Sequence, residues 1–237
     1  MVNCQMVNRI IVAIDGYSSC GKSTVAKALA KYAGYTYVDT GAMYRAVALY
    51  ARRNKPTPTP SLKGWEHEAI VSLLENIHIG FVQTPDGQHV TLNGEDVESQ
   101  IRTLEVGELA SQISTIKEVR AFLVAQQQAM GIEKGIVMDG RDIGTVVFPQ
   151  AELKFFLTAS PEVRAKRRFL ELQAKGDTPD YEEVLRATNE RDYRDTHRAE
   201  SPLRQAEDAV VVDNSEMTRE EQLNHIIHLF SERCATV

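Results

Sequence analysis

The sequence predicts an α/β fold with a five-stranded parallel sheet as its core, and two observations predict it. Five short apolar runs are bounded by turn-forming residues, which is typical of strands buried on both faces. Helical periodicity fills the chain between these runs, as expected for helices that cover a parallel sheet. The predicted strands are Arg9–Asp15, Tyr35–Asp39, Ile136–Asp139, Leu153–Thr158 and Ala209–Asp213.

The first strand is followed by "GYSSCGKST", which begins at Gly16 and ends at Thr24, directly before a helix-forming segment. Its Gly-x-x-x-x-Gly-Lys-Ser pattern matches the phosphate-binding loop in the strand–helix context that this motif requires. The glycines let backbone N–H groups turn toward phosphate oxygens, the helix adds the positive end of its dipole, and Lys22 adds a full charge. The hydroxyl of Ser23 is where a Mg²⁺ ion would bind. Cys20 is either an oxidisable thiol or a small residue that fills the loop.

This loop predicts a nucleoside triphosphate site without naming the reaction. A GTP-driven switch needs an Asn-Lys-x-Asp stretch, which the sequence lacks, and a mechanical ATPase needs an activating acid beside the acidic end of a strand, whereas "GIVMDG" supplies only Asp139. A phosphotransferase with a small acceptor is the leading class, with Ser23 and Asp139 as candidate metal ligands, directly or through water. The residues expected to bind ATP are Gly16, Tyr17, Ser18, Ser19, Cys20, Gly21, Lys22, Ser23 and Thr24.

Two further clusters follow predicted strands, at the edge of a parallel sheet where ligands bind. In "DTGAMYR", Arg45 lies in the first turns of a helix and can face an acceptor anion, although a lone arginine there is more often a surface residue. In "DGRDIGT", Arg141 offers a planar donor fork suited to phosphate and Asp142 offers an acceptor. The same turn can also be an ion-paired loop.

A basic region extends from Ser160 to Arg204 and holds ten of the 27 Lys and Arg residues, balanced by ten Asp and Glu. A solvated pair of helices laced with ion pairs has this composition too. The helix that starts at a Ser160 cap and Pro161 carries basic residues near its beginning, where the dipole disfavours them, and this favours a ligand role. Those residues are Arg164, Lys166, Arg167 and Arg168.

The stretch "ERDYRDTHR" is the most informative part of this region. If it is helical, four of its charged residues fall at i, i+3, i+4 and i+7, on one face about 10 Å long. Three guanidinium groups and one carboxylate on one face suit a nucleotide, with arginines on phosphates and the carboxylate on ribose hydroxyls. The four residues are Arg191, Arg194, Asp195 and Arg198.

An insertion interrupts the alternation of strands and helices. "KPTPTPS", Lys55–Ser61, is expected to be a linker, because its prolines remove hydrogen-bond donors and bias their neighbours toward extended backbone. After it, "IHIGFV" and "HVTLNG" flank "QTPDGQ", which predicts an antiparallel hairpin. At the other end of the chain, "EEQLNHIIHLF" predicts an amphipathic core helix.

Composition limits the class of protein. The chain has 237 residues, 43% of them hydrophobic, and can bury a full core. The net charge of -6 argues against a dedicated nucleic-acid or anionic-membrane surface. Cys4, Cys20 and Cys234 have no disulfide or zinc spacing, and the N-terminus has no targeting pattern. A cytoplasmic monomer without membrane or nucleic-acid partners is expected.

Taken together, these residues resemble a known family. The phosphate loop, "DTGAMYR", "SQ" at Ser111, "VR" at Arg120, "DGRDIGTVVFP" and "ERDYRDTHRAESPL" occur in the order and spacing of bacterial cytidylate kinases, from about Ile10 to Phe230. The resemblance implies a P-loop kinase fold with a core, an acceptor lobe enlarged by a β-rich insertion, and a short helical lid. It also implies transfer of the γ-phosphoryl group of ATP to CMP or dCMP with Mg²⁺.

The resemblance implies roles for individual residues as well. It assigns Ser111, Arg120 and Asp142 to the cytosine and Asp195 to the ribose. The acceptor phosphate would be held by Arg45, Arg141 and Arg198, and the transferred phosphoryl group would be surrounded by Lys22, Arg141, Arg164 and Arg191. Thr40 stands where the family often has a serine of the acceptor site, and keeps its hydroxyl. An aspartate at position 142 also fits the chemistry, because a carboxylate accepts from the exocyclic amine of cytosine and repels the carbonyl of uracil.

The expected organisation follows from these assignments. Core segments are predicted at 9–55, 131–159 and 196–230, the β-rich insertion at 56–98, acceptor-lobe helices at 99–130, and the lid with the arginine-rich helices at 160–195. The phosphate loop departs from the family's common Gly-Pro-Ser-Gly-Ala-Gly-Lys-Gly-Thr at Tyr17, Ser19, Cys20 and Ser23. The alternatives are a P-loop kinase for UMP or a hydroxy acid, and a regulatory protein that binds ATP without consuming it.

Overall fold

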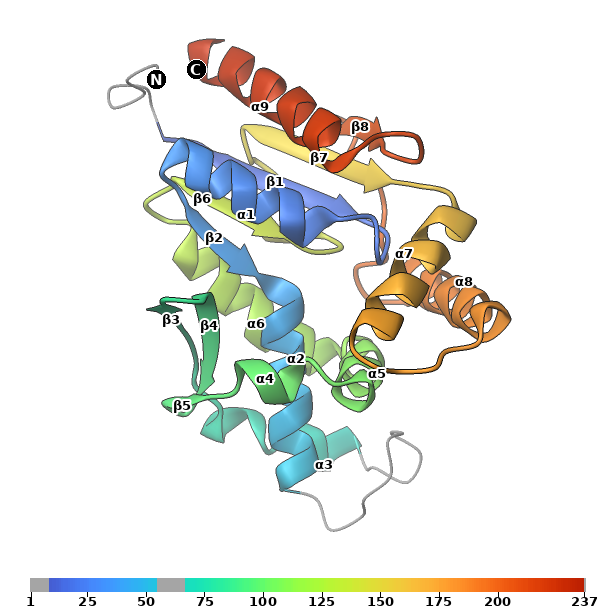
Figure 1. Cartoon of the computed structure of the whole chain (residues 1–237). Helices are drawn as coiled ribbons and strands as arrows, with labels where there is room; N and C mark the ends of the chain where they lie inside the picture. Colours follow the sequence, from blue (N-terminus) through green and yellow to red (C-terminus); the bar gives the residue numbers. More distant parts are fainter. Residues whose placement is uncertain (1–8, 55–66, 237) are drawn as a thin grey trace. The chain divides into compact units, whose positions relative to one another are not determined.

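The computed structural model describes residues 9–54 and 67–236, which divide into two compact units (Figure 1). The first unit contains the described residues up to Val38 and from Gln128 onward, and the second contains the described part of Asp39–Gln127. The second unit therefore begins earlier than the insertion predicted at residue 56. The reason is that the helix after the second strand, α2 (Thr40–Arg53), packs against α5 (Leu104–Ile113).

The core of the first unit is a five-stranded sheet with the order β2-β6-β1-β7-β8. In β1, Val12 lies opposite Val137 of β6 and Leu153 of β7, and both pairings are parallel, as is that of β7 with β8. The predicted α/β fold with a five-stranded parallel sheet is confirmed, and each strand begins and ends within two residues of its predicted run. The strands are β1 (Ile11–Gly16), β2 (Thr36–Asp39), β6 (Ile136–Asp139), β7 (Leu153–Thr158) and β8 (Val210–Asp213).

Two helices, α1 (Lys22–Ala33) and α9 (Arg219–Thr236), share a hydrophobic core with this sheet (Figure 1). Ile14 and Leu157 of the sheet are fully buried, as is Leu29 of α1, and Phe230 of α9 is nearly so. The predicted amphipathic helix at the C-terminal end is therefore confirmed. The free thiols of Cys20 and Cys234 are buried, Cys20 entirely, so Cys20 fills space in this core. Cys4 lies outside the described residues.

The expectation that all five strands are buried on both faces is wrong for β8. Val212 is buried, but Val211 is 47% exposed and Val210 is 36% exposed. Strand β8 is at the edge of the sheet, and successive side chains of a strand point to opposite faces. Val212 thus belongs to the core shared with α9, and Val211 points to the opposite, exposed face. Val210 is on the same face as Val212 but is only partly covered at the start of this edge strand.

Three further helical segments complete the first unit: η2, a π-helix (Ile143–Val147), α7 (Pro161–Ala174) and α8 (Tyr181–His197). The predicted cap of α7 is confirmed, because the Ser160 side chain accepts from Val163 N at 3.3 Å. The predicted helical position of Arg198 is wrong. It is the C-cap of α8 and has extended backbone, with φ −62° and ψ 145°, so only the other three residues of the predicted face lie on the helix.

In the second unit, an antiparallel hairpin pairs β3 (Ile79–Thr84) with β4 (Gly87–Leu92), and Thr84 lies opposite Gly87. The predicted hairpin is confirmed, and a two-residue strand, β5 (Glu95–Asp96), extends it. The linker predicted at Lys55–Ser61 lies outside the described residues. The remaining elements are α3 (His67–Val71), the 3₁₀-helix η1 (Leu74–Asn76), α4 (Glu98–Ile101) and most of α6 (Lys117–Met130). Across residues 9–54 and 67–236, we find no helix with the length and apolar character to span a membrane.

Candidate active site

The phosphate-binding loop connects β1 to α1, as predicted, and its backbone geometry depends on glycine. Gly16 has φ +143°, and a Cβ there would lie 2.0 Å from the carbonyl oxygen of Leu157. Gly21, the N-cap of α1, has φ +84°, and Ser19 between them has φ +57°. These left-handed conformations turn the chain sharply into the helix. The loop is therefore held against β7 by a contact that only a residue without a side chain allows.

Lys22 is buried at the first position of α1. Its Nζ donates to the carbonyl oxygen of Tyr17 at 2.5 Å, within the loop itself. Burial lowers the pKa of this amine, and the positive charges of Arg141 and Arg191 lower it further. Lys22, Arg141 and Arg191 are thus close enough for their charges to act on one another, and we call them the cationic cluster; the charge of Asp139 partly offsets them. An anionic phosphate group beside this cluster would compensate charges that repel one another.

Ser23 and Asp139 lie together, as the sequence predicts for candidate metal ligands. Ser23 Oγ donates to Asp139 Oδ2 at 2.9 Å, and the hydroxyl of Tyr37 donates to Asp139 Oδ1 at 2.7 Å. A hydroxyl and a carboxylate are hard oxygen ligands, and Mg²⁺ is usually held by one or two such groups together with water and substrate phosphates. These residues therefore fit Mg²⁺. Tyr37 was not among the predicted site residues, and it is 102 residues from Asp139 in the sequence.

Asp195 is buried on α8 and ion-paired to Arg141, with 2.9 Å between Arg141 Nε and Asp195 Oδ2. Burial opposes ionisation of this carboxyl, but Arg141, Arg191 and Arg198 together hold its pKa below the ordinary value. Arg198 additionally donates to the carbonyl oxygen of Ser201, through Nε at 2.9 Å and Nη2 at 2.6 Å. The structure thus brings together four predicted site residues: Arg141, Arg191, Asp195 and Arg198.

Asp142 follows Arg141 and is the N-cap of η2. Its side chain makes no capping hydrogen bond, and the residue is 5% exposed. Its carbonyl oxygen accepts from Val146 N at 2.9 Å and Val147 N at 3.2 Å. The backbone at Asp142 is therefore tied to the π-helix, while its carboxylate is not used to cap that helix.

Arg164 makes contacts that the sequence did not predict. It is 2% exposed, its Nη2 lies 2.6 Å from Asp192 Oδ2, and its Nε donates to Ala159 O at 2.9 Å. Its guanidinium also lies over the ring of Tyr17, 4.9 Å from the centroid. Arg164 therefore joins α7, α8 and the phosphate loop. Its expected contact with the transferred phosphoryl group stays a prediction.

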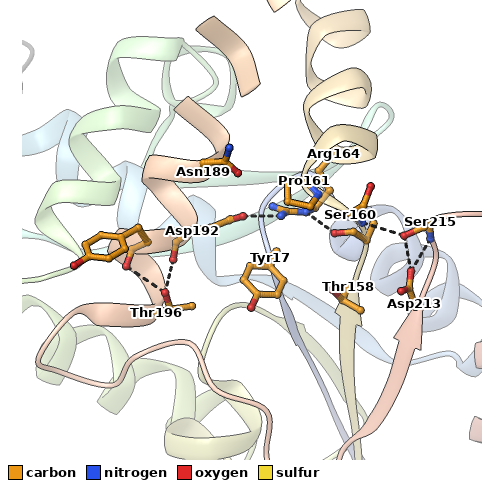
Figure 2. A pocket seen from close by; sticks show the side chains of 12 residues that line it. Tyr17, Thr158, Ser160, Pro161, Arg164, Asn189, Asp192, Thr196, Asp213 and Ser215 are labelled. Carbon is orange, nitrogen blue, oxygen red and sulfur yellow. Dashed lines mark hydrogen bonds and ion pairs between the residues drawn. The ribbon is translucent and has the colours of Figure 1, made fainter. Parts of the chain in front are cut away.

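A pocket of about 560 Å³ lies beside this arginine (Figure 2). Its lining includes Tyr17 from the phosphate loop, Thr158 and Asp213 at the ends of β7 and β8, and Asn189 and Asp192 from α8. Figure 2 shows Asp192 directed toward Arg164 and Asp213 toward Ser215. Protein groups thus engage one oxygen of each carboxylate, Oδ2 of Asp192 and Oδ1 of Asp213.

Asn214 is a site residue that the sequence argument missed. Its side chain donates to Cys20 O at 2.7 Å and accepts from Arg167 Nη1 at 2.8 Å, and its carbonyl oxygen accepts from Arg167 Nη2 at 2.8 Å. It is fully buried directly after β8. An amide that follows the last strand, at the same edge of the sheet as the phosphate loop, was the signal that could have found it.

The second unit holds the other predicted acceptor residues. Arg120 Nη1 donates to Ser114 O at 3.1 Å, Ser114 Oγ donates to Ser111 O at 2.8 Å, and the Arg120 guanidinium lies 5.6 Å from the Tyr44 ring centroid. Arg45, the next residue after Tyr44, donates from Nη1 to Ile101 O at 3.2 Å. Ser111, Arg120 and the Tyr44–Arg45 turn of α2 therefore lie together.

The start of α2 contains Thr40 and an unexpected ion pair. Thr40 is the first residue of the helix and is buried. Asp39 caps the helix by accepting from Ala42 N at 2.9 Å, and its other oxygen lies 3.0 Å from Arg102 Nη2. Arg102, 63 residues away, carried no sequence signal that marked it as a partner of this cap.

Within the described residues, the first unit combines a phosphate-binding loop, a cationic cluster, a hydroxyl–carboxylate pair and an ionised aspartate among arginines. This set can bind phosphates and stabilise charge that develops on them. Phosphoryl transfer depends mainly on positioning and on such charge neutralisation. A nucleophilic side chain is not needed when the acceptor supplies its own oxygen.

Comparisons with known proteins agree with this chemistry. The model of the family described as "Cytidylate kinase" matches residues 12–232. A "Cytidylate kinase" of Flavobacterium johnsoniae is 53% identical over 228 residues, which cover 95% of this chain and 98% of that protein. A "Cytidylate kinase" of Parabacteroides distasonis is 56% identical over 221 residues, which cover 91% of this chain and 94% of that protein.

Proposed function

The chain belongs to the cytidylate kinase family, and from this premise we propose that it transfers the γ-phosphoryl group of ATP to CMP or dCMP. The observation that supports this reaction best is the cationic cluster of Lys22, Arg141 and Arg191 in the unit that contains the phosphate loop. Such a cluster is suited to the charge on a transferring phosphoryl group.

In the proposed reaction, the N–H groups of residues 16–24 and the positive end of α1 bind the ATP phosphates, with Lys22 among them. An oxygen of the CMP phosphate forms a bond to the γ-phosphorus, and the bond from that phosphorus to the β–γ bridging oxygen breaks. The electron pair of that bond leaves with ADP, and the products are ADP and CDP. Lys22, Arg141, Arg164 and Arg191 stabilise the charge on the transferred group.

Ser23, together with Asp139 directly or through water, would hold Mg²⁺, which supplies neutralisation of the phosphate charge. The chain's own part is to fix the position of these oxygens, and the Tyr37 hydroxyl does so by holding the second oxygen of Asp139. We further propose that the lid formed by α7 and α8 excludes water, which competes with CMP as acceptor.

For the acceptor, we propose that Asp142 accepts from the exocyclic amine of cytosine and that Arg120 and Ser111 donate to its carbonyl and ring nitrogen. Asp195 would bind the ribose hydroxyls. The acceptor phosphate would be held by Arg45, Arg141 and Arg198, and Thr40 would also contact CMP. Family membership does not favour UMP, a hydroxy acid or a purely regulatory role.

The test is ADP formation from ATP and Mg²⁺ in parallel reactions with CMP, dCMP, UMP, AMP and no acceptor. We expect rapid ADP formation with CMP and dCMP, a weak rate with UMP, and none above background without acceptor. An equal rate without acceptor would identify an ATPase and contradict the proposal. A rate that is higher with UMP than with CMP would contradict the assignment of Asp142 to cytosine.

A further inference from the structure

We propose that Asp15 is a positioning residue for base recognition, because it fixes the backbone that places Asp142. This inference rests on the proposed role of Asp142 in cytosine binding. Asp15 is in β1, directly before the first glycine of the phosphate loop, and no step of the proposed reaction uses it.

The geometry is a two-point clamp. Asp15 Oδ1 accepts from Ile143 N at 2.8 Å, and Asp15 Oδ2 accepts from Gly144 N at 2.7 Å. The two donors are consecutive N–H groups that immediately follow Asp142, and they come from a part of the chain 128 and 129 residues away. Because both oxygens are engaged, the clamp fixes the orientation of this peptide as well as its distance from β1.

The two hydrogen bonds that Asp15 accepts take the place of a side-chain cap at the start of η2. The first N–H groups of a helix have no partner within the helix and usually bond to the side chain of the N-cap residue. In η2 the N-cap is Asp142, and its side chain makes no such bond. The Gly144 N–H is at a position that an N-cap side chain can reach, and Asp15 accepts from it as well as from the preceding Ile143 N–H. The carboxylate of Asp142 therefore need not bend back on its own helix.

Burying a carboxylate at this position costs free energy, and a purely structural contact would not require one. Burial raises the pKa of Asp15 to about 7, the Gly144 and Ile143 N–H groups lower it, the charge of Asp142 raises it, and Lys22 lowers it. The stem of Lys154, on β7, packs near Gly144 on the same side. One N–H group needs only a neutral acceptor, whereas a carboxylate offers a separate acceptor oxygen to each of two consecutive N–H groups, as Asp15 does here.

The first test compares Asp15→Asn with a matched control, Glu152→Gln. Glu152 is also a carboxylate that accepts a backbone N–H group of β1, since its Oε2 lies 2.8 Å from Ile11 N, at the opposite end of that strand. Each change replaces one acceptor oxygen by an NH₂ group that faces an N–H donor. The measured quantities are KM for ATP, KM for CMP, and the ratio of kcat/KM for CMP to that for UMP, at about pH 8.

We expect Asp15→Asn to lower the CMP-to-UMP ratio by about tenfold or more, because displacement of a binding group by a fraction of an ångström is costly. KM for CMP rises, while KM for ATP changes less than about twofold. Glu152→Gln leaves the ratio unchanged. Hydrogen exchange of the Ile143 and Gly144 amides becomes faster in Asp15→Asn alone. Parallel increases of KM for ATP and CMP with an unchanged ratio would overturn the proposal, since Asp15 would then act on the phosphate loop.

A second variant keeps the proposal testable if Asp15→Asn does not fold. A Cβ at Gly144 would lie 3.1 Å from Lys154 Cδ and 3.4 Å from Asp15 Oδ2, so the methyl group added in Gly144→Ala crowds the Lys154 stem and the Asp15 carboxylate. We expect Gly144→Ala to lower the CMP-to-UMP ratio and to raise KM for CMP, as Asp15→Asn does, but by smaller factors. An unchanged ratio with faster exchange of both amides would overturn the proposal.

Asp142→Asn separates this inference from the proposed function. If that variant keeps the wild-type ratio of kcat/KM for CMP to that for UMP, Asp142 does not recognise the base, and its proposed role in cytosine binding is wrong. If Asp142→Asn loses the ratio and Asp15→Asn retains it, the premise holds and the positioning role of Asp15 is rejected.

Discussion

The phosphate loop and the arginines around Asp195 are positioned by different forces. Gly16 lies against the backbone of Leu157, and the loop is fixed by a close approach that no side chain permits. Arg141, Arg191 and Arg198 are instead held around the buried carboxylate of Asp195. The loop therefore depends on backbone shape, and the arginines depend on a compensating charge. Changes in shape and changes in charge should act separately on the two regions.

The largest effect is expected from Gly16→Ala, which breaks the region that depends on shape. Its Cβ would lie 2.0 Å from a backbone oxygen, so the strand and the loop must shift. We expect the variant to lose about 4 kcal/mol or more of unfolding free energy and to lose ATP binding as well. Gly34→Ala is the control, because Gly34 has φ +67° with no atom within 4 Å of the added Cβ, and should lose about 1 kcal/mol. Urea unfolding measures both, and equal losses would show that close approach is not what fixes the loop.

The region that depends on charge is tested by Asp195→Asn. The variant removes the buried carboxylate that pairs with Arg141 and lies among three guanidinium groups. We expect a loss of about 3 kcal/mol of unfolding free energy together with a higher KM for CMP. Asp213→Asn removes an exposed carboxylate that accepts from the backbone N–H and the hydroxyl of Ser215, and it should lose less than about 1 kcal/mol. If added salt or phosphate does not restore part of the stability of Asp195→Asn, charge compensation is not what holds the arginines.

The carboxylate of Asp15 is buried next to the phosphate loop, and the free energy of unfolding should therefore vary with pH. Burial raises the pKa of Asp15 to about 7, so between its ordinary value and about 7 the native state binds a proton that the unfolded state has released. Stability is then lost as the pH rises through this window. From about pH 5 to about pH 8, we expect wild type to lose about 2 to 3 kcal/mol relative to Asp15→Asn. A parallel pH dependence of the two proteins would contradict the raised pKa.

How much of the fold and of the candidate site could be predicted depends on how far apart in the sequence the contacting residues lie. The strands and the phosphate loop depend on local patterns, and they were predicted within two residues. Some contacts join residues 63 to 129 positions apart, and local patterns do not record them: Arg102 with Asp39, Tyr37 with Asp139, and the Ile143 and Gly144 N–H groups with Asp15. Arg198 was placed on a helix because the charge spacing continues past His197, where the backbone has already left the helix.

The smallest effect concerns β8, where the sequence predicted burial on both faces. Val212→Ala should lose about 2 kcal/mol, whereas Val211→Ala should lose less than about 0.5 kcal/mol, because only Val212 is buried. The two changes remove the same atoms from neighbouring residues, so each is the control for the other in urea unfolding. Equal losses would mean that a partner covers the exposed face of β8 in solution.

The most direct measurement of the central claim is ³¹P NMR of wild type with ATP, Mg²⁺ and CMP. The proposed transfer predicts that the phosphate signal of CMP disappears while the two signals of CDP appear, with ADP formed in equal amount. ADP together with inorganic phosphate, and no CDP, would contradict the claim that the γ-phosphoryl group passes to CMP.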